Sequence, residues 1–326
     1  MISTLVTADI LVPILADLQA VEAKLRESAL ENQNPALTSA LDHLLASGGK
    51  RVRPAVTLLS ARLFDAPRGR SVALAAALEM LHTATLVHDD LIDGSLLRRG
   101  LPTLNAQWTP GATVLTGDFL FARAAELAAE TDSVRVMRIF SRTLMVIVNG
   151  EINQMFVGRG QASREGYLQR IYAKTASLFA VASEAAAVLG EADAATVSAM
   201  RSFGREVGMA FQIMDDILDF TGDETRLGKP VGSDLRQGLF TLPVLYFLEA
   251  YPDDRDVAAL LNGRSGDAER VERVVQAVRD SDAVGQALNE AKAYIGRAQA
   301  ALAPMPDNEY RRALSDLAEY FVSRNV

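Results

Sequence analysis

Two acidic triplets with the same spacing are the strongest chemical signal in this 326-residue chain. One reads Asp89-Asp90-Leu91-Ile92-Asp93 and the other Asp215-Asp216-Ile217-Leu218-Asp219. Each ends an apolar run with helical spacing, so its outer carboxylates should lie on one helix face about 6 Å apart. Like charges at that distance repel, and a divalent cation relieves the repulsion. Oxygen-only ligands favour Mg²⁺, which readily shares its coordination shell with phosphate oxygens.

A solvated helix face is the alternative explanation for either triplet alone. Two observations favour metal binding: the spacing occurs twice, and both triplets adjoin strongly apolar sequence. We therefore expect two facing metal-binding clamps at the mouth of an apolar cavity. The candidate residues are Asp89, Asp90, Asp93, Asp215, Asp216 and Asp219.

Basic residues gather in short motifs. The segment Gly48-Gly49-Lys50-Arg51-Val52-Arg53-Pro54 places three cations at the start of a predicted helix, where free N–H groups also attract anions. Arg98-Arg99 closely follows the first triplet, Lys174-Thr175 lies in a helical run, and Lys229 lies in a glycine-containing loop. Each cluster alone is typical of a solvated surface. Together with two acidic triplets they indicate a substrate that carries several phosphates.

The elements that position these groups are predicted to be helices throughout. Apolar residues recur at helical spacing, and the alternation typical of strands is missing. No fixed-period repeat, low-complexity linker or abrupt composition shift divides the chain. We expect one all-α domain over residues 1–326, a single large helical bundle around a deep central cavity. The expected helices span 8–30, 36–47, 53–66, 70–94, 112–130, 132–157, 164–189, 193–221, 238–250, 268–280, 283–303 and 307–324.

Composition argues against several classes of function. The chain has 33 Lys+Arg against 41 Asp+Glu, a formal charge of −8, and no dense basic tract, so no nucleic-acid partner is expected. The absence of cysteine excludes disulfides and thiol catalysis and fits a cytoplasmic location. The N-terminus lacks the basic region of a signal peptide, and no uninterrupted apolar stretch reaches about 18 residues. We therefore expect no transmembrane segment.

Taken together, the motifs resemble those of the trans-polyprenyl diphosphate synthases (the isoprenyl diphosphate synthase family), and in particular the long-chain type. They run from Gly48 to Pro243 in the family's order, and the all-α pattern extends the likeness over essentially the whole chain. Leu239 is a departure, because many shorter-chain members have lysine there, although longer-chain members commonly lack it. The matching motifs are those at 48–54, 89–93, Arg98-Arg99-Gly100, Gly117-Asp118, Lys174-Thr175, 211–219 and Gly228-Lys229-Pro230-Val231-Gly232-Ser233-Asp234.

This resemblance implies Mg²⁺-dependent condensation of isopentenyl diphosphate with an allylic diphosphate, either farnesyl or geranylgeranyl diphosphate, by ionisation, condensation and elimination. The implied product is a long all-trans polyprenyl diphosphate of C30–C50. A short-chain farnesyl or geranylgeranyl diphosphate synthase, with a C15–C20 product, is the alternative. The resemblance also implies a homodimer, three Mg²⁺ ions per substrate-loaded site with Mn²⁺ as a substitute, and peripheral membrane contact during product release.

Residue roles follow from the same resemblance. Metal would be bound by Asp89, Asp93 and Asp215, with support from Asp90, Asp216 and Asp219. The allylic diphosphate would be held by Arg98, Lys174 and Lys229, and isopentenyl diphosphate by Lys50, Arg51, Arg53, His82 and Arg99. The catalytic residues would be Lys174, Thr175 and Gln212, with the oxygens of the last two facing the developing carbocation. The released diphosphate is the implied base, so no side chain takes that role.

Three of the nearby residues have alternative explanations. His82 is either a ligand of isopentenyl diphosphate or a hydrogen-bonded core histidine. His88, just before the first triplet, is expected to support the metal cluster without binding the metal. Phe211 is expected to form cavity wall instead of a cation–π contact.

Product length should depend on the helix that carries Asp89. Residues one and two turns before it act as a ruler, since each turn rises about 5.4 Å. The expected wall residues are Leu81, Ala84 and Thr85, and none of them is aromatic, so a growing chain can pass. The alternative for Ala84 is that it only packs within the helix and has no role in product length. Another helix could also supply the floor of the product tunnel, through Phe119, Phe121, Met145 or Met155.

Two other classes share parts of this pattern. A terpene cyclase also has a helical bundle and an Asp-rich motif, but its second metal site normally contains Asn, Ser or Thr, and it lacks the basic residues for a second diphosphate. A non-catalytic subunit of a heteromeric synthase is expected to lose parts of the metal clamps. Both triplets are intact here.

Overall fold

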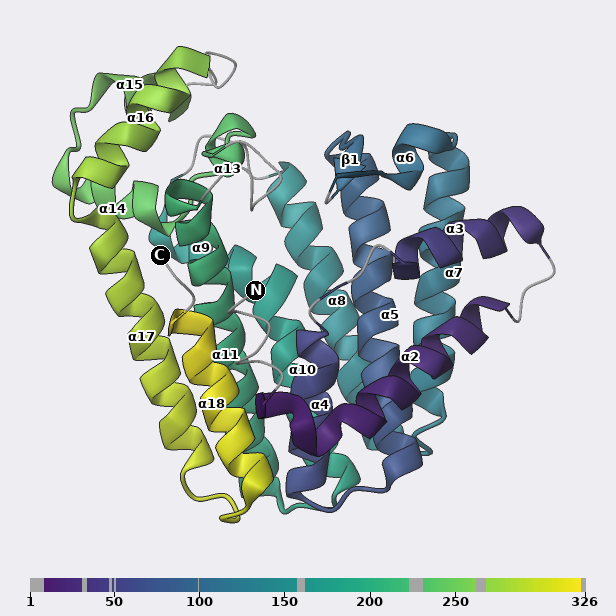
Figure 1. Ribbon diagram of the computed structural model, residues 1–326. Coiled ribbons are helices and arrows are strands. Elements are labelled where there is room, and N and C mark those ends of the chain that lie inside the picture. The colour runs from purple at the N-terminus through teal and green to yellow at the C-terminus, as the bar shows by residue number, and fades with distance from the viewer. Residues whose placement is uncertain are drawn as a thin grey trace. The chain divides into compact units, whose positions relative to one another are not determined.

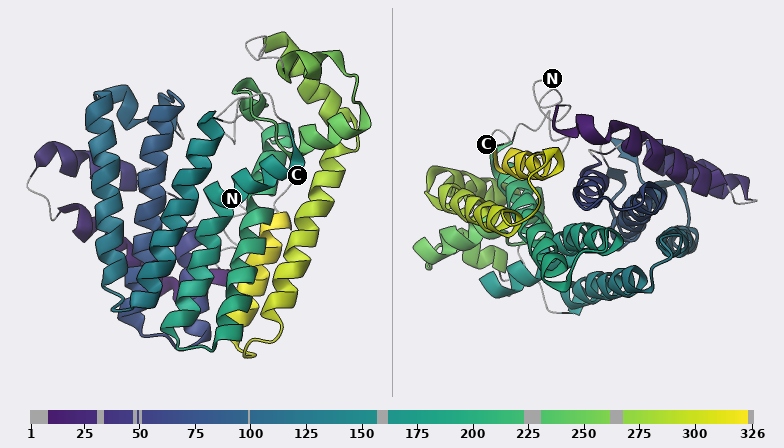
Figure 2. Two further views of the ribbon diagram at one scale, coloured as in Figure 1. Left: turned by 180° about the vertical axis from the view of Figure 1, so that it is seen from behind. Right: turned by 90° about the horizontal axis from the view of Figure 1, so that it is seen from below.

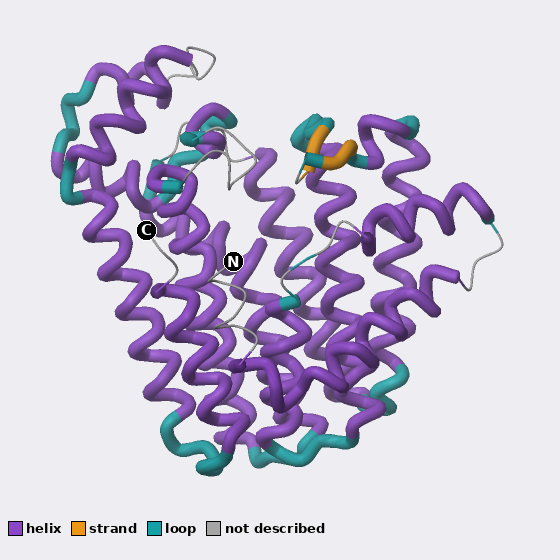
Figure 3. The backbone as a smooth tube through the Cα atoms, in the orientation of Figure 1, coloured by secondary structure: helices purple, strands orange, loops and turns teal. Residues whose placement is uncertain are grey.

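The computed structural model describes residues 9–30, 34–46, 49, 51–98, 100–156, 162–222, 231–261 and 268–323. This described part is almost entirely helical and contains one antiparallel hairpin, β1 (Leu97–Arg98) and β2 (Leu101–Pro102) (Figure 3). The helices, labelled in Figure 1, are η1 (Val12–Ile14), α2 (Leu15–Leu30), α3 (Pro35–Ala46), α4 (Val52–Leu63), α5 (Arg68–Ile92), α6 (Leu104–Gln107), α7 (Pro110–Ala129), α8 (Val134–Phe156), α9 (Arg164–Ile171), η2 (Tyr172–Ala176), α10 (Ser177–Leu189), α11 (Ala194–Thr221), α13 (Ser233–Arg236), α14 (Leu242–Ala250), α15 (Arg255–Leu261), α16 (Ala268–Asp280), α17 (Ala283–Leu302) and α18 (Glu309–Ser323).

The all-α prediction is confirmed, and the long predicted helices are present with shifted ends. Periodicity missed α6, α13, α15 and the hairpin because each is too short to show a repeat. The predicted helix 164–189 is wrong as a single α-helix. Its middle, η2, is a π-helical turn between α9 and α10, and such turns are frequent at functional sites.

Contacts divide the chain into two compact units. The first comprises residues 1–142, 181–201 and 305–314, and the second comprises residues 143–180, 202–304 and 315–326. A single domain over 1–326 stays a prediction, and the two units are described separately below.

In the first unit, α5 is the central helix. Every residue from Ser71 to Leu81 is buried, so the helix has neighbours on all sides, among them α2, α4 and α7. Its partner α7 runs alongside it (Figures 1 and 2). Among the described helices, α5 alone is long and apolar enough to cross a membrane, but 72% of its most apolar window is buried inside the protein. Such burial is typical of a core helix.

In the second unit, α11 packs closely on η2 and α10. Gly204 and Gly208 lie one turn apart on α11 and leave no room for a side chain. A Cβ atom at Gly204 would overlap the backbone of Phe179, and one at Gly208 would lie 2.5 Å from the Cα atom of Ala176. This close approach brings the following turns of α11 against η2.

Candidate active site

The first acidic triplet lies at the C-terminal end of α5. Asp89 and Asp90 are 8% and 6% exposed, and Asp93, which follows the last helical residue, is exposed. The partial negative charge of a helix C-terminus makes carboxylates there unfavourable. The second triplet has the same placement, because α11 ends at Thr221, just beyond Asp219. Both helix ends therefore concentrate negative charge that a cation would stabilise.

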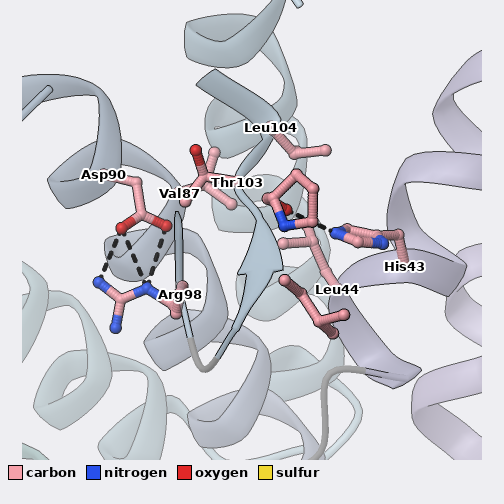
Figure 4. A pocket seen from close by; sticks show the side chains of 9 residues that line it. His43, Leu44, Val87, Asp90, Arg98, Thr103 and Leu104 are labelled. Atoms are coloured by element: carbon pink, nitrogen blue, oxygen red, sulfur yellow. Dashed lines mark hydrogen bonds and ion pairs between the residues drawn. The ribbon is translucent and has the colours of Figure 1, made fainter. Parts of the chain in front are cut away.

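Arg98 binds Asp90 through a two-nitrogen fork. Its Nε donates to both carboxylate oxygens at 3.0 Å, and its Nη2 donates to Oδ1 at 2.8 Å (Figure 4). Arg98 lies on β1, and Gly100 makes the turn of the hairpin with a positive φ of +78°. Asp90 thus fixes the position of the Arg98 guanidinium at the triplet. The neighbouring Arg99 lies outside the described residues.

The basic motif at 48–54 is described only in part. Lys50 lies outside the described residues, as does Lys229 in its own loop. Arg51 has a positive φ of 48° immediately before α4 and forms ion pairs with Glu22 and Glu79. Burial opposes its charge, but these two carboxylates outweigh burial and raise the pKa of Arg51. Arg51 therefore ties the start of α4 to α2 and α5.

Arg53 lies in the first turn of α4, partly exposed, and its carbonyl accepts a hydrogen bond from the Thr57 hydroxyl at 2.9 Å. His82 is also partly exposed, on α5, and its carbonyl accepts from Thr85 at 2.7 Å.

His88 lies against the first turns of α7. Its Nε2 is 3.2 Å from the carbonyl of Val114 and 3.6 Å from the carboxylate of Asp118, and its ring centroid is 5.1 Å from that of Phe121. A Cβ atom at Gly117 would overlap the His88 ring. The Gly117-Asp118 motif therefore has a physical explanation: glycine makes room for the histidine that precedes the triplet.

The predicted wall residues differ in exposure. Leu81 and Ala84 are fully buried on α5, while Thr85 is partly exposed. Met145 and Met155 are 57% and 60% exposed on α8, which argues against either as the floor of an enclosed tunnel. Among the other floor candidates, Phe119 and Phe121 on α7 are partly exposed.

A chain of hydrogen bonds links the catalytic candidates of the second unit. The Thr175 hydroxyl donates to Gln212 Oε1 at 2.6 Å, and Gln212 Nε2 donates to Asp216 at 2.8 Å. The buried Tyr167 donates its hydroxyl to the other Asp216 oxygen at 2.7 Å. Thr175 lies in η2, so the π turn presents it to α11. Sequence reasoning missed Tyr167, although it lies two helical turns before Lys174, on the same predicted helix face.

Charge is concentrated around Asp216. Burial, followed by the nearby charge of Asp234, raises the pKa of Asp216 to about 8. Burial also raises the pKa of Tyr167 well above its usual value, with Asp216 as the next cause. Asp234 belongs to the loop motif at 228–234, and its backbone N–H donates to the buried Asp219 carboxylate at 3.1 Å. The loop motif is therefore joined to the second triplet by its last residue.

Lys174 is paired with an acidic residue of α8. Its Nζ lies 3.1 Å from Glu151 Oε1.

Phe211 packs on two other aromatic side chains, with ring centroids 5.3 Å from that of Phe179 and 5.1 Å from that of Phe321. The cavity-wall role of Phe211 stays a prediction.

The donor set fits a hard divalent cation. Within the described ranges, no group of three or more His, Asp or Glu side chains is already arranged to hold a metal ion. Mg²⁺ is commonly bound by one or two carboxylates together with phosphate oxygens and water, so a preassembled cage is not needed. The raised pKa of Asp216 is the shift that a nearby cation would reverse.

Comparison with known proteins identifies the family. The sequence model described as "Polyprenyl synthetase" matches residues 34–278. A heptaprenyl diphosphate synthase component 2 from Geobacillus stearothermophilus is 42% identical over 311 residues, which is 95% of this chain and 96% of that protein. An octaprenyl diphosphate synthase from Haemophilus influenzae is 36% identical over 287 residues, 87% of each chain.

A solved structure agrees. The polyprenyl synthase from Caulobacter crescentus CB15, complexed with calcium and isoprenyl diphosphate, is 39% identical, with a TM-score of 0.90 over 98% of each chain. As the sequence motifs predicted, the chain belongs to the polyprenyl synthetase family and is a prenyltransferase.

Proposed function

We propose that this enzyme condenses isopentenyl diphosphate with an allylic diphosphate, farnesyl or geranylgeranyl diphosphate, to make an all-trans polyprenyl diphosphate of C30–C50. The observation that carries the proposal is the pair of Asp-Asp-x-x-Asp triplets at two helix ends, each with a basic side chain in its own unit, Arg98 and Lys174. The heptaprenyl and octaprenyl names of the relatives support a long product.

The proposed cofactor is Mg²⁺, three ions per substrate-loaded site, with Mn²⁺ as a substitute. When bound, the ions would neutralise negative charge on the departing diphosphate. Calcium with isoprenyl diphosphate in the Caulobacter protein supports a divalent cation. The proposed ligands are Asp89, Asp93 and Asp215. Asp90, Asp216 and Asp219 would support these ligands. The contact of Asp90 with Arg98, and those of Asp216 with Tyr167 and Gln212, agree with a supporting role.

The proposed substrate contacts follow the distribution of cations. Arg98, Lys174 and Lys229 would bind the allylic diphosphate, and Lys50, Arg51, Arg53, His82 and Arg99 would bind isopentenyl diphosphate. Lys174 would exchange part of its contact with Glu151 for the diphosphate, whose greater charge favours it.

Thr175 and Gln212 would stabilise the carbocation with their oxygens, because fixed dipoles aimed at developing charge lower the barrier. The Thr175 hydroxyl already donates to Gln212, so the lone pairs of Thr175 are left to face the cation. The buried Leu81 and Ala84, with Thr85, would line the path of the growing chain. The exclusion of water by such apolar residues would protect the cation until the double bond of isopentenyl diphosphate attacks it.

We further propose a homodimer in the cytoplasm, with peripheral membrane contact at product release. An exposed apolar stripe on α8 supports self-association: Met145, Val148, Ile152, Met155 and Phe156 are 57%, 40%, 44%, 60% and 81% exposed. Their spacing of three and four residues places them on one helix face. A heteromeric partner is the alternative, because one relative is named component 2.

The test is a product assay on the purified chain with radiolabelled isopentenyl diphosphate, farnesyl diphosphate and Mg²⁺, with and without a chelator. We expect chelator-sensitive products between C30 and C50. Accumulation at C20, a single addition to the C15 primer, would overturn the long-chain proposal in favour of a short-chain synthase. A cyclised hydrocarbon would indicate a terpene cyclase. A complete lack of turnover by the chain alone would overturn the proposal in favour of a synthase that stops at C15, a non-catalytic subunit or a subunit that needs a heteromeric partner.

A further inference from the structure

The hairpin that carries Arg98 is held from two directions. From one side, Asp90 on α5 binds the Arg98 guanidinium with distances of 2.8–3.0 Å. From the other side, His43 Nε2 lies 2.9 Å from the carbonyl oxygen of Pro102 on β2 (Figure 4). Because a carbonyl only accepts, His43 Nε2 must carry the hydrogen. His43 belongs to α3, which precedes the hairpin by more than 50 residues.

The base of the hairpin is anchored to the end of α5 by short-range bonds. Thr103 is 4% exposed, its hydroxyl donates to the Ser95 carbonyl at 2.7 Å, and its N–H donates to the Leu96 carbonyl at 3.0 Å. The Ser95 N–H in turn donates to the Asp90 carbonyl at 2.8 Å. These bonds fix where the hairpin begins and ends. The hydrogen bond from His43, in contrast, is made to a residue within strand β2, Pro102.

The hairpin has little buried surface of its own. Each strand is two residues long, and Leu97 and Leu101 are 68% and 41% exposed. A small cavity of about 30 Å³, lined by His43, Leu44, Val87 and Leu104 among others, lies beside it. Because so short a hairpin has little packing of its own, the long-range hydrogen bond from His43 adds to the bonds at its base in fixing its position.

We infer that His43 is a positioning residue for the prenyl transfer reaction. Through Pro102 it holds the hairpin so that Arg98 stays directed at the diphosphate of the allylic substrate. The inference rests on the proposed function, in which Arg98 binds that diphosphate. Neither acidic triplet nor any basic motif contains His43, and no substrate contact is required of it.

Steady-state kinetics test this role. We expect His43→Ala to raise KM for the allylic diphosphate about three- to tenfold, the effect of one lost hydrogen bond, with little change in kcat or in KM for isopentenyl diphosphate. His43→Gln should retain the wild-type KM, because the Gln Nε2 donor reaches a similar position. If His43 acts through Arg98, the double variant His43→Ala/Arg98→Ala should be no worse than Arg98→Ala alone. Additive losses would overturn the inference.

Fluorescence gives a readout that needs no activity. Trp108, the only tryptophan in the chain, follows α6, and Thr103 caps that helix immediately after Pro102. His43→Ala should increase acrylamide quenching of Trp108, while the control Asp42→Ala, an exposed neighbour on α3, should not. We expect His43→Gln to keep the wild-type melting temperature and the wild-type quenching. That result would show that the change in His43→Ala is local and does not come from misfolding.

The two proposals fail in different ways. An unchanged KM in Arg98→Ala would refute the role of Arg98 in the proposed function, and quenching would still report whether His43 holds the hairpin. A raised KM in Arg98→Ala, combined with unchanged KM and unchanged quenching in His43→Ala, would refute the positioning role of His43 alone.

Discussion

Asp216 is a buried acid among polar partners, and its raised pKa of about 8 has a consequence for stability. Between about pH 4, the value for an unfolded chain, and pH 8, the folded state keeps a proton that the unfolded state releases. This contribution to stability is therefore lost as the pH rises through that window. Asn cannot ionise. We measure the melting temperatures of Asp216→Asn and wild type in the presence of a chelator. The difference, variant minus wild type, should increase by several degrees as the pH rises from 5 to 8.

A control for this prediction is Asp256→Asn. Hydrogen bonds from Arg273, the first cause, and from Arg270 lower the pKa of Asp256 to about 2. Its stabilising contribution is present above about pH 4 and is lost only as the pH falls toward 2. The offset between this variant and wild type should therefore be constant from pH 5 to pH 8. A constant offset for Asp216→Asn as well would contradict the raised pKa.

Ala84 is the residue at which product length can be tested most directly. It is fully buried one turn before the first triplet, and a ring there would close the proposed path of the growing chain. We expect Ala84→Phe to shift the product distribution to shorter chains while the first condensation continues, as measured with radiolabelled isopentenyl diphosphate. An unchanged distribution in a folded variant would remove Ala84 from the wall.

Helix α11 places Gln212 and Asp216 because it approaches η2 closely. Gly204, Gly208, Gln212 and Asp216 follow one another at intervals of four residues, so the contact surface and the polar chain share one side of the helix. We expect Gly208→Ala to lower the free energy of unfolding by about 1–3 kcal/mol, measured by urea denaturation. The backbone of Ala176 would have to move to admit the new Cβ atom.

The matched control is Gly296→Ala in α17. An added Cβ atom there meets nothing within 4 Å, and alanine favours a helix over glycine by about 0.5–1 kcal/mol. This variant should therefore be more stable than wild type. If both variants were stabilised, close packing of α11 on η2 would be disproved.

Sequence patterns predicted the long elements well, because α5 and α11 repeat apolar residues over many turns. They did not predict η2, since a π turn leaves no distinct trace in an apolar run. The hairpin was missed because two residues per strand show no alternation. The triplets and basic motifs were visible as spacing within one segment. Tyr167 and His43 were not, because their partners, Asp216 and Pro102, are 49 and 59 residues away.

At the scale of the whole molecule, the apolar stripe of α8 is a large exposed hydrophobic surface. Soluble proteins usually cover such surfaces with a partner. We expect Ile152→Glu to convert the proposed homodimer into monomers, as measured by size-exclusion chromatography with light scattering, because a charge in an apolar interface is unfavourable.

The control Asn153→Glu places the same charge beside the stripe and should leave the dimer intact. A wild-type chain that is monomeric would contradict the homodimer and direct attention to a different partner chain. Activity measured on the same fractions would show whether assembly is needed for turnover.

Gly117 has a further consequence for how this enzyme tolerates mutation. Any side chain added there would overlap the far end of the His88 side chain and would have to displace its ring, so a saturation library at this position should be depleted above all of large residues. A screen that scores survival alone would rank Gly117 beside the acidic triplets. The cause would be different: the lost variants would have displaced a histidine ring instead of a substrate.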